Sequence, residues 1–196
     1  MEAGMNQVEG PGTTRRLAVE LGQLPLPREE FGFRRTACAC TSCQVHCRIM
    51  PGSLVPSDLA RLCPPGQELF AWAEVHLRAV AGTPFPTLVP ARATNGHCHW
   101  LFAGRCAVHE AAPFGCAFFD THMTDGEMKQ RLEATLQARR LDAAAQGPYY
   151  QVWRHLRLKG LTAEAGNRSV VLEQVAKIRS SADRVYRTLP RPKCDR

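Results

Sequence analysis

The sequence predicts a mainly α-helical chain with irregular cysteine-rich segments. After residue 123, apolar residues recur at steps of three or four, which is the helical period. Before it, prolines and glycines punctuate the chain so densely that only short elements can form. Eight of the nine cysteines also lie there, between Cys38 and Cys116. We therefore expect a metal-organised N-terminal module followed by about three C-terminal helices.

Composition divides the chain into three parts. Residues 1–30 carry glycine, proline and scattered charge with little apolar content, which is typical of a flexible arm. Residues 31–123 form the cysteine-cluster module. Residues 124–196 form a basic helical region with few breaks. The aliphatic content is sufficient for a hydrophobic core.

The elements within the module are predicted to be short. Residues 56–59 resemble a helix start, with Ser57 as a candidate N-cap. Residues 69–76 form a second short element, but residues 73–80 alternate between apolar and polar like a strand, so helix and strand both stay open here. Residues 89–93 predict a short strand.

Three helices are predicted in the C-terminal region. Thr124 and Glu127 fit a capping box, in which each side chain binds the backbone of the other. Pro148 suits the first turn of a second helix, and Gly160 suits its end. A third helix is predicted over residues 171–189, where apolar residues recur at helical spacing.

Charge is unevenly distributed along the chain. Residues 1–123 carry 10 basic and 10 acidic side chains, whereas residues 124–196 carry 15 basic and 8 acidic ones, so the net charge of +7 lies in the C-terminal part. A basic segment attracts nucleic acid, acidic protein or anionic membrane. The same spacing of charges is also typical of solvated helix surfaces. One alternative function is therefore an adaptor that binds nucleic acid or acidic protein through the basic C-terminal helices.

Cysteine use depends on the compartment. No stretch approaches the roughly 18 apolar residues that cross a bilayer, so we expect no membrane partner. Residues 1–16 lack the apolar core of a secretory signal, which predicts a cytoplasmic protein. Thiols stay reduced in that compartment, and an odd number of cysteines fits a disulfide framework poorly. The pattern favours metal binding over disulfides or inert buried thiols.

The spacing of the cysteines selects the candidate ligands. Cys40 and Cys43 form a Cys-x-x-Cys pair, which presents two sulfurs to one metal from a tight turn, whereas Cys38 is too near Cys40 to share the ion easily. A structural zinc or a cubane cluster needs four ligands. Six thiols would suit two metals with shared thiolates, or one site with two spare thiols. The candidate metal ligands are Cys40, Cys43, Cys47, Cys98, Cys106 and Cys116.

Other side chains near these cysteines leave alternatives open. Zinc accepts imidazole beside thiolate, so each nearby histidine is either a ligand or a structural residue. These histidines are His46, His97, His99, His109 and His122. Glu110 and Asp120 are the nearest acids, either supporting a ligand or lying on the surface. We expect Cys63 to pack in the core and Cys194 to be an exposed thiol. No catalytic set can be picked out, so catalytic residues stay unassigned.

The ordered cysteine segments resemble a known family. Residues 40–47, 98–101 and 106–116 follow the order of segments in the YkgJ-type cysteine-cluster family, described as zinc- or iron-chelating domains. The resemblance covers roughly residues 33–120, and His109 stands where that family usually has tyrosine.

The resemblance implies a metal cofactor held by the six thiolates: Zn²⁺ or iron, the latter including an Fe–S cluster. Relatives have been linked to iron–sulfur oxidoreductases and, through a fused domain, to protein lysine methylation. An alternative function is therefore an iron–sulfur redox protein or a metal-dependent modifying enzyme. The principal expectation is a cytoplasmic metal-binding protein whose metal stabilises a region too rich in turns to fold by burial alone.

Overall fold

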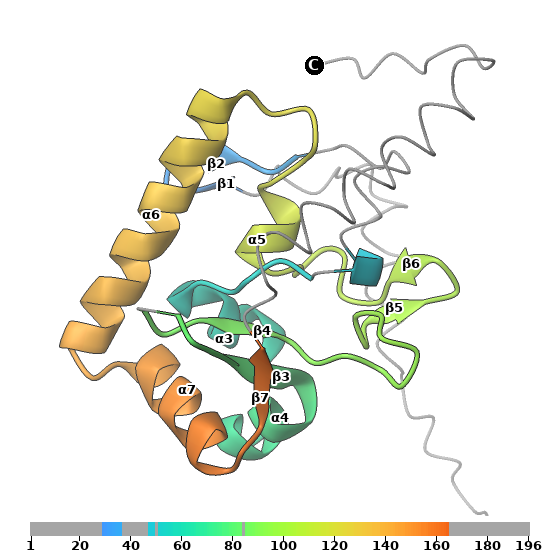
Figure 1. The fold of residues 1–196 in the computed structure, drawn as a ribbon, viewed down its shortest axis with the longest axis vertical. Helices are drawn as coiled ribbons and strands as arrows, with labels where there is room; N and C mark the ends of the chain where they lie inside the picture. The colour runs from blue at the N-terminus through green and yellow to red at the C-terminus, as the bar shows by residue number, and fades with distance from the viewer. Residues whose placement is uncertain (1–28, 37–46, 50, 84, 165–196) are drawn as a thin grey trace, which may run out of the picture.

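The computed structural model describes residues 29–36, 47–49, 51–83 and 85–164. The described residues are 43% helix and 16% strand, arranged around three small sheets (Figure 1). The expectation of a mainly α-helical fold is therefore wrong. In chain order the elements are β1 (Glu29–Glu30), β2 (Phe33–Arg34), α3 (Pro56–Leu62), α4 (Leu69–His76), β3 (Leu77–Ala81), β4 (Leu88–Pro90), β5 (Leu101–Phe102), β6 (Arg105–Cys106), α5 (Phe114–Ala117), α6 (Asp125–Ala144), α7 (Pro148–Leu158) and β7 (Thr162–Glu164).

The largest sheet has the strand order β4-β3-β7. β3 is antiparallel to β4, with Leu77 opposite Pro90, and parallel to β7, with Ala79 opposite Thr162. α4 and α7 pack against each other and against β3 (Figure 1). The strand predicted at residues 89–93 overlaps β4, and the alternation at residues 73–80 overlaps β3. β7 was not predicted, because three residues are too few to show an alternating pattern.

The hydrophobic core joins segments from both sides of residue 123. Leu54, Leu77 and Leu88 are fully buried together with Tyr149 and Leu156 of α7. Burial of one such side chain contributes about 1.5–3 kcal/mol. The composition changes at residue 123, but the core is continuous across it. The helical region and part of the cysteine-rich region are therefore stabilised together.

The two short helices of the first half have their own caps. α3 begins after Val55, and the Asp58 carboxylate accepts the Val55 amide at 2.8 Å. The prediction that Ser57 caps this helix is wrong, because Pro56 already occupies the first helical position. The ambiguous segment contains both predicted structures in succession: helix α4, then strand β3.

The first two predicted C-terminal helices are confirmed. Thr124 and Glu127 form the capping box of α6, and Pro148 stands in the first turn of α7. Gly160 follows α7 with a φ of +69°, a conformation that glycine adopts without steric cost. The third predicted helix, residues 171–189, lies outside the described residues. No helix in the described ranges is long and apolar enough to cross a bilayer.

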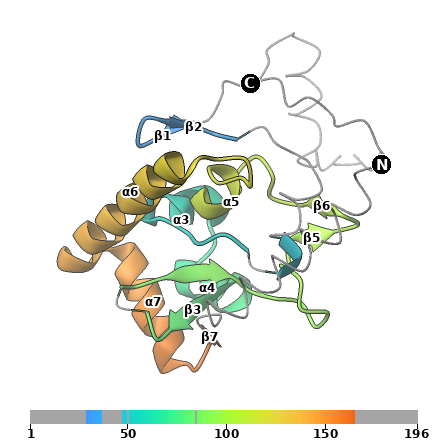
Figure 2. The same cartoon turned by 45° about the horizontal axis from the view of Figure 1, so that its top comes forward.

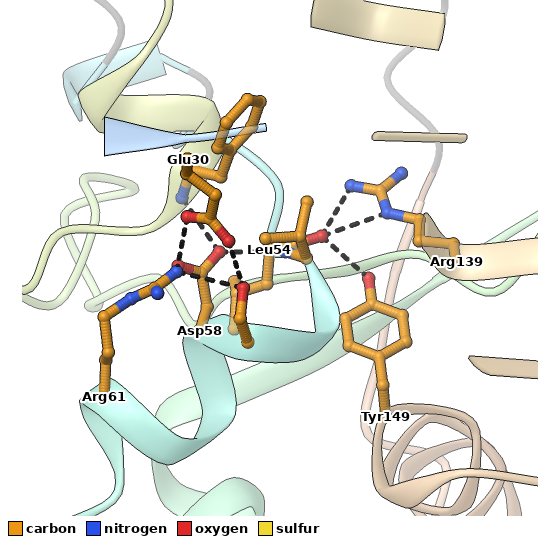
Figure 3. Close-up of polar contacts among 9 residues, drawn as sticks. Glu30, Leu54, Asp58, Arg61, Arg139 and Tyr149 are labelled. Carbon is orange, nitrogen blue, oxygen red and sulfur yellow. Dashed lines mark hydrogen bonds and ion pairs between the residues drawn. The ribbon is translucent and has the colours of Figure 1, made fainter. Parts of the chain in front are cut away.

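The inward face of α6 is polar. Thr135 and Arg139 are 3% and 4% exposed, whereas Met128 and Leu132 are 42% and 50% exposed. Arg139 donates to the Leu54 carbonyl through Nε and Nη2, at 3.0 and 2.7 Å. The Tyr149 hydroxyl donates to the same carbonyl at 3.0 Å (Figure 3). α6 is thus attached to the core by hydrogen bonds to buried backbone, a contact that an apolar face could not make.

Candidate metal centre

Four of the six predicted ligands lie in described segments, and the charges of these four thiols interact in pairs. They are Cys47, Cys98, Cys106 and Cys116. Cys40 and Cys43 lie outside the described residues, as do Cys38, His46 and Cys194. The four thiols come from separate stretches of the chain, and each stretch is positioned by its own backbone contacts.

Cys47 is placed by the backbone around Cys98. Residues 47–49 are helical and lie beside the hairpin of β5 and β6 in two views (Figures 1 and 2). The Cys98 amide donates to the Cys47 carbonyl at 2.9 Å. Nη2 of Arg92 donates to the Ile49 carbonyl at 2.5 Å, and Arg92 itself forms a β-bridge with Cys98. The first cysteine segment is therefore held directly against the second.

Cys106 is placed by the hairpin that follows Cys98. Leu101 of β5 pairs with Cys106 of β6. The turn between them uses Ala103 and Gly104 with φ values of +47° and +75°, which suits a tight two-residue hairpin connection. This hairpin returns the chain towards Cys98. Cys98 and Cys106, which are eight positions apart, are therefore both positioned by the β5–β6 hairpin.

Cys116 is placed by a close backbone crossing. The Gly52 amide donates to Sγ of Cys116 at 3.2 Å. A Cβ added to Gly52 would lie 2.0 Å from the carbonyl carbon of Gly115, and one added to Gly115 would lie 2.4 Å from the Ser53 nitrogen. Only glycine fits at both positions. The crossing brings α5, and Cys116 with it, onto the chain that leads from Cys47.

The four sulfurs lie near enough for their charges to interact. Burial raises the pKa of all four thiols, that of Cys98 to about 11, and it acts most strongly on Cys116. Repulsion between thiolates raises the pKa values further. Each of the four thiols interacts in this way with the other three, so all six pairs are involved. Without a counter-charge the thiols are neutral at physiological pH. A bound cation would stabilise the thiolates and reverse both effects.

Backbone amides partly oppose this rise. The amides of Trp100 and Leu101 lower the pKa of Cys98 as donors to its sulfur. The Val108 amide does the same for Cys106, and the Gly52 amide does so for Cys116. Such donors favour the thiolate form and orient sulfur ligands in metal sites. The donor set therefore fits a thiophilic metal such as zinc or iron.

Both ends of segment 37–46, which contains Cys40 and Cys43, are attached near these thiols. On one side, the Thr36 amide donates to the carbonyl of Ala117, the residue after Cys116, at 2.8 Å. On the other side lies Cys47, bound to Cys98.

No family model, curated protein or solved structure matches the chain. Within the described ranges, no group of three or more His, Cys, Asp or Glu side chains is arranged so that it could hold a metal ion. The four thiols are related to one another by charge interaction.

The histidines near the cluster have different surroundings. The ring of His99 packs against His76 and Trp100, at centroid distances of 4.9 and 4.6 Å. Burial lowers the pKa of His99 to about 4, so its ring is neutral. His109 is exposed, and its carbonyl accepts a hydrogen bond from Arg35. His97 is half-buried and His122 is exposed.

The remaining predicted residues contact other groups. Cys63 is partly buried against the main core, in agreement with its predicted packing role. Glu110 is exposed and forms an ion pair with Arg35 at 3.3 Å. Asp120 accepts the His122 amide at 2.8 Å. Sequence reasoning missed Arg35, which bridges the loop between Cys106 and Cys116, because nothing in the spacing distinguishes it from other arginines.

Proposed function

We propose that this chain is a cytoplasmic metal-binding cysteine-cluster protein, with Zn²⁺ or iron as its cofactor and a mainly structural role for the metal. The supporting observation is the charge interaction that relates Cys47, Cys98, Cys106 and Cys116, which come from different stretches of the chain. Burial raises the pKa of these thiols, and a bound cation would stabilise their thiolate forms.

The metal would connect segments whose regular elements are very short. β5 and β6 have two residues each, and residues 47–49 contribute a single helical turn. Elements of this size do not fold independently. A metal held by the four thiols, with Cys40 and Cys43 as further ligands, would supply positive charge that stabilises the thiolates and would link the segments. The amides of Trp100 and Val108 would orient the sulfurs.

We also infer that the chain is related to the YkgJ-type cysteine-cluster family. This inference is supported by the order of the cysteine segments and by the proximity of the thiols that the resemblance selects as ligands. Cytoplasmic location is supported by the free thiols of the described cysteines, which a reducing compartment preserves.

The test is metal analysis of protein purified without oxygen. Stoichiometric zinc in a colourless protein would indicate a structural zinc site, and a brown protein with visible absorption would indicate an iron–sulfur cluster. We expect Cys106→Ser to lose most of the metal. Cys63→Ser is the matched control and should keep it, because burial and Glu68 raise the pKa of Cys63 and none of the four thiols is among the causes. A folded, metal-free wild-type protein, or full metal content in Cys106→Ser, would overturn the proposal.

A further inference from the structure

The tip of the β5–β6 hairpin exposes an aromatic ring. Phe102 is 80% exposed, the highest value among the large apolar side chains of the described residues. It stands at the start of the tight turn through Ala103 and Gly104. The hairpin lies between Cys98 and Cys106, so a metal at the cluster would hold the ring in a fixed position.

Arginines lie on the hairpin and on the segment beside it. Arg105 pairs with Phe102 across the hairpin, and Arg48 is exposed on the adjoining helical turn, whereas Arg92 is bound to the Ile49 carbonyl. Phe102, Arg48 and Arg105 are called the hairpin surface below. Residues 47–49 and 91–112 contain one acid, Glu110, and its carboxylate is bound by Arg35. The hairpin surface is therefore positively charged.

The arginines of α6 are used differently. Arg139 is 4% exposed and binds the Leu54 carbonyl, and Arg131 donates to the Phe118 carbonyl at 2.6 Å. These two residues belong to the basic C-terminal part but hold the fold together. In the described part of the chain, the hairpin surface thus combines exposed positive charge with an exposed aromatic ring in a way that α6 does not.

We propose that the hairpin surface binds single-stranded nucleic acid, with a base stacked on Phe102 and phosphates held by Arg48 and Arg105. Aromatic rings bind bases of any sequence by stacking, and guanidinium groups pair with phosphate in a bidentate manner. Compact metal-thiolate loops are among the modules that recognise unstacked bases. The net charge of +7 would favour approach of a polyanion. This activity goes beyond metal binding and uses different side chains.

An acidic protein could also bind arginines, but it offers no base to stack on the ring. The experiment therefore separates stacking from charge. Fluorescence anisotropy would compare a labelled short oligouridylate with an abasic oligonucleotide of the same length. We expect the oligouridylate to bind at least several-fold more tightly. Phe102→Ala should weaken its binding roughly 5- to 100-fold, towards the abasic level, and Phe102→Tyr should retain it.

Matched controls keep the test specific. Leu158→Ala removes another highly exposed apolar side chain, at 78%, and should leave binding unchanged. Arg105→Gln should weaken binding and lower the slope of log affinity against log salt by about 0.7, whereas Arg154→Gln, an exposed arginine of α7, should not. The metal content of each variant is measured, so that a disrupted cluster is recognised as a failure of the metal site.

Three results would overturn the proposal. The first is an affinity for the abasic oligonucleotide equal to that for the oligouridylate. The second is an equal affinity for polyglutamate, which would indicate a surface for acidic protein. The third is unchanged oligouridylate binding in Phe102→Ala with full metal content.

Discussion

The two halves of this molecule differ in how regularly they are built. Around β3, α4 and α7, the side chains of Leu77, Leu88 and Val152 are fully buried in one core. The segment from Cys98 to Cys106 contributes Cys98 and Trp100 to the same core, but its hairpin has two-residue strands and exposes Phe102 at its tip. The first region satisfies the ordinary conditions for folding by burial. In the second, a metal at the proposed cluster would add links between its short segments.

The two halves are connected by buried polar contacts. The Asp58 carboxylate accepts the amides of Val55 and Phe114, both at 2.8 Å, and binds Arg61 at 2.8 Å (Figure 3). Burial raises the pKa of Asp58, and these donors act against that rise. Phe114 begins α5, the helix of Cys116. Asp58 therefore attaches the core helix α3 to the cysteine module.

The largest expected effect is that of metal removal. Chelation should open the module and leave the core folded, because only the module depends on the metal for its links. By hydrogen exchange, the amides of Cys98 and Ala107 should lose protection on the order of 100-fold or more, whereas those of Leu54 and Val80 should change little. Unchanged protection of Cys98 in fully chelated protein would show that burial alone holds the module.

The second prediction concerns the glycine crossing. Gly52→Ala places a Cβ 2.0 Å from Gly115, so the backbones must separate and Cys116 must shift. We expect a loss of about 2–4 kcal/mol in unfolding free energy and metal affinity weakened roughly 10- to 100-fold. Gly126→Ala is the control, because nothing lies within 4 Å of its added Cβ. It should stabilise α6 by up to about 1 kcal/mol. Equal effects of the two variants would contradict this account.

Local signals in the sequence predicted the helices well. The Thr124 capping box and Pro148 specify helix starts through contacts within a few residues, and such contacts are readable from one chain. The helical spacing did not show which face of α6 is buried. That face carries Thr135 and Arg139, because the Leu54 carbonyl needs a donor, and this need exists only after folding.

The sheet and the site show the same limit. The pairing of β3 with β7 joins segments far apart in the chain, and no spacing rule predicts it. The cysteine order predicts a set of metal ligands, and this stays a prediction: the four that are described interact by charge, but no group among the described residues could hold a metal ion as placed. The approach of Gly52 to Gly115 and the Arg35 contacts escaped prediction, since neither is encoded by local pattern.

The third prediction tests the core by itself. Leu156 is fully buried, so Leu156→Ala should lower the unfolding free energy by about 2–5 kcal/mol in a urea titration. Leu158→Ala, on the same helix but 78% exposed, should change it by less than about 0.5 kcal/mol. Metal content should stay at the wild-type level in both. If Leu156→Ala releases the metal from protein that is still folded, the two halves are not separately stabilised.

The smallest effect should come from Tyr149, through pH. Burial raises its pKa from 10.0 to about 12, and its neutral hydroxyl donates to Leu54 while accepting the Leu88 amide. Because the folded state holds the phenol proton more tightly, this stabilisation is complete below pH 10 and is lost as pH rises towards 12. The loss should be at most about 3 kcal/mol in the unfolding free energy.

Tyr149→Phe should be less stable by about 1–2 kcal/mol at neutral pH, with a flatter profile of unfolding free energy against pH above pH 10. Tyr150→Phe is the control for removing a tyrosine hydroxyl elsewhere on the same helix. Metal content, measured along the same pH titration, should not change in parallel with the unfolding free energy. A wild-type profile as flat as that of Tyr149→Phe would mean that the core does not depend on the neutral phenol.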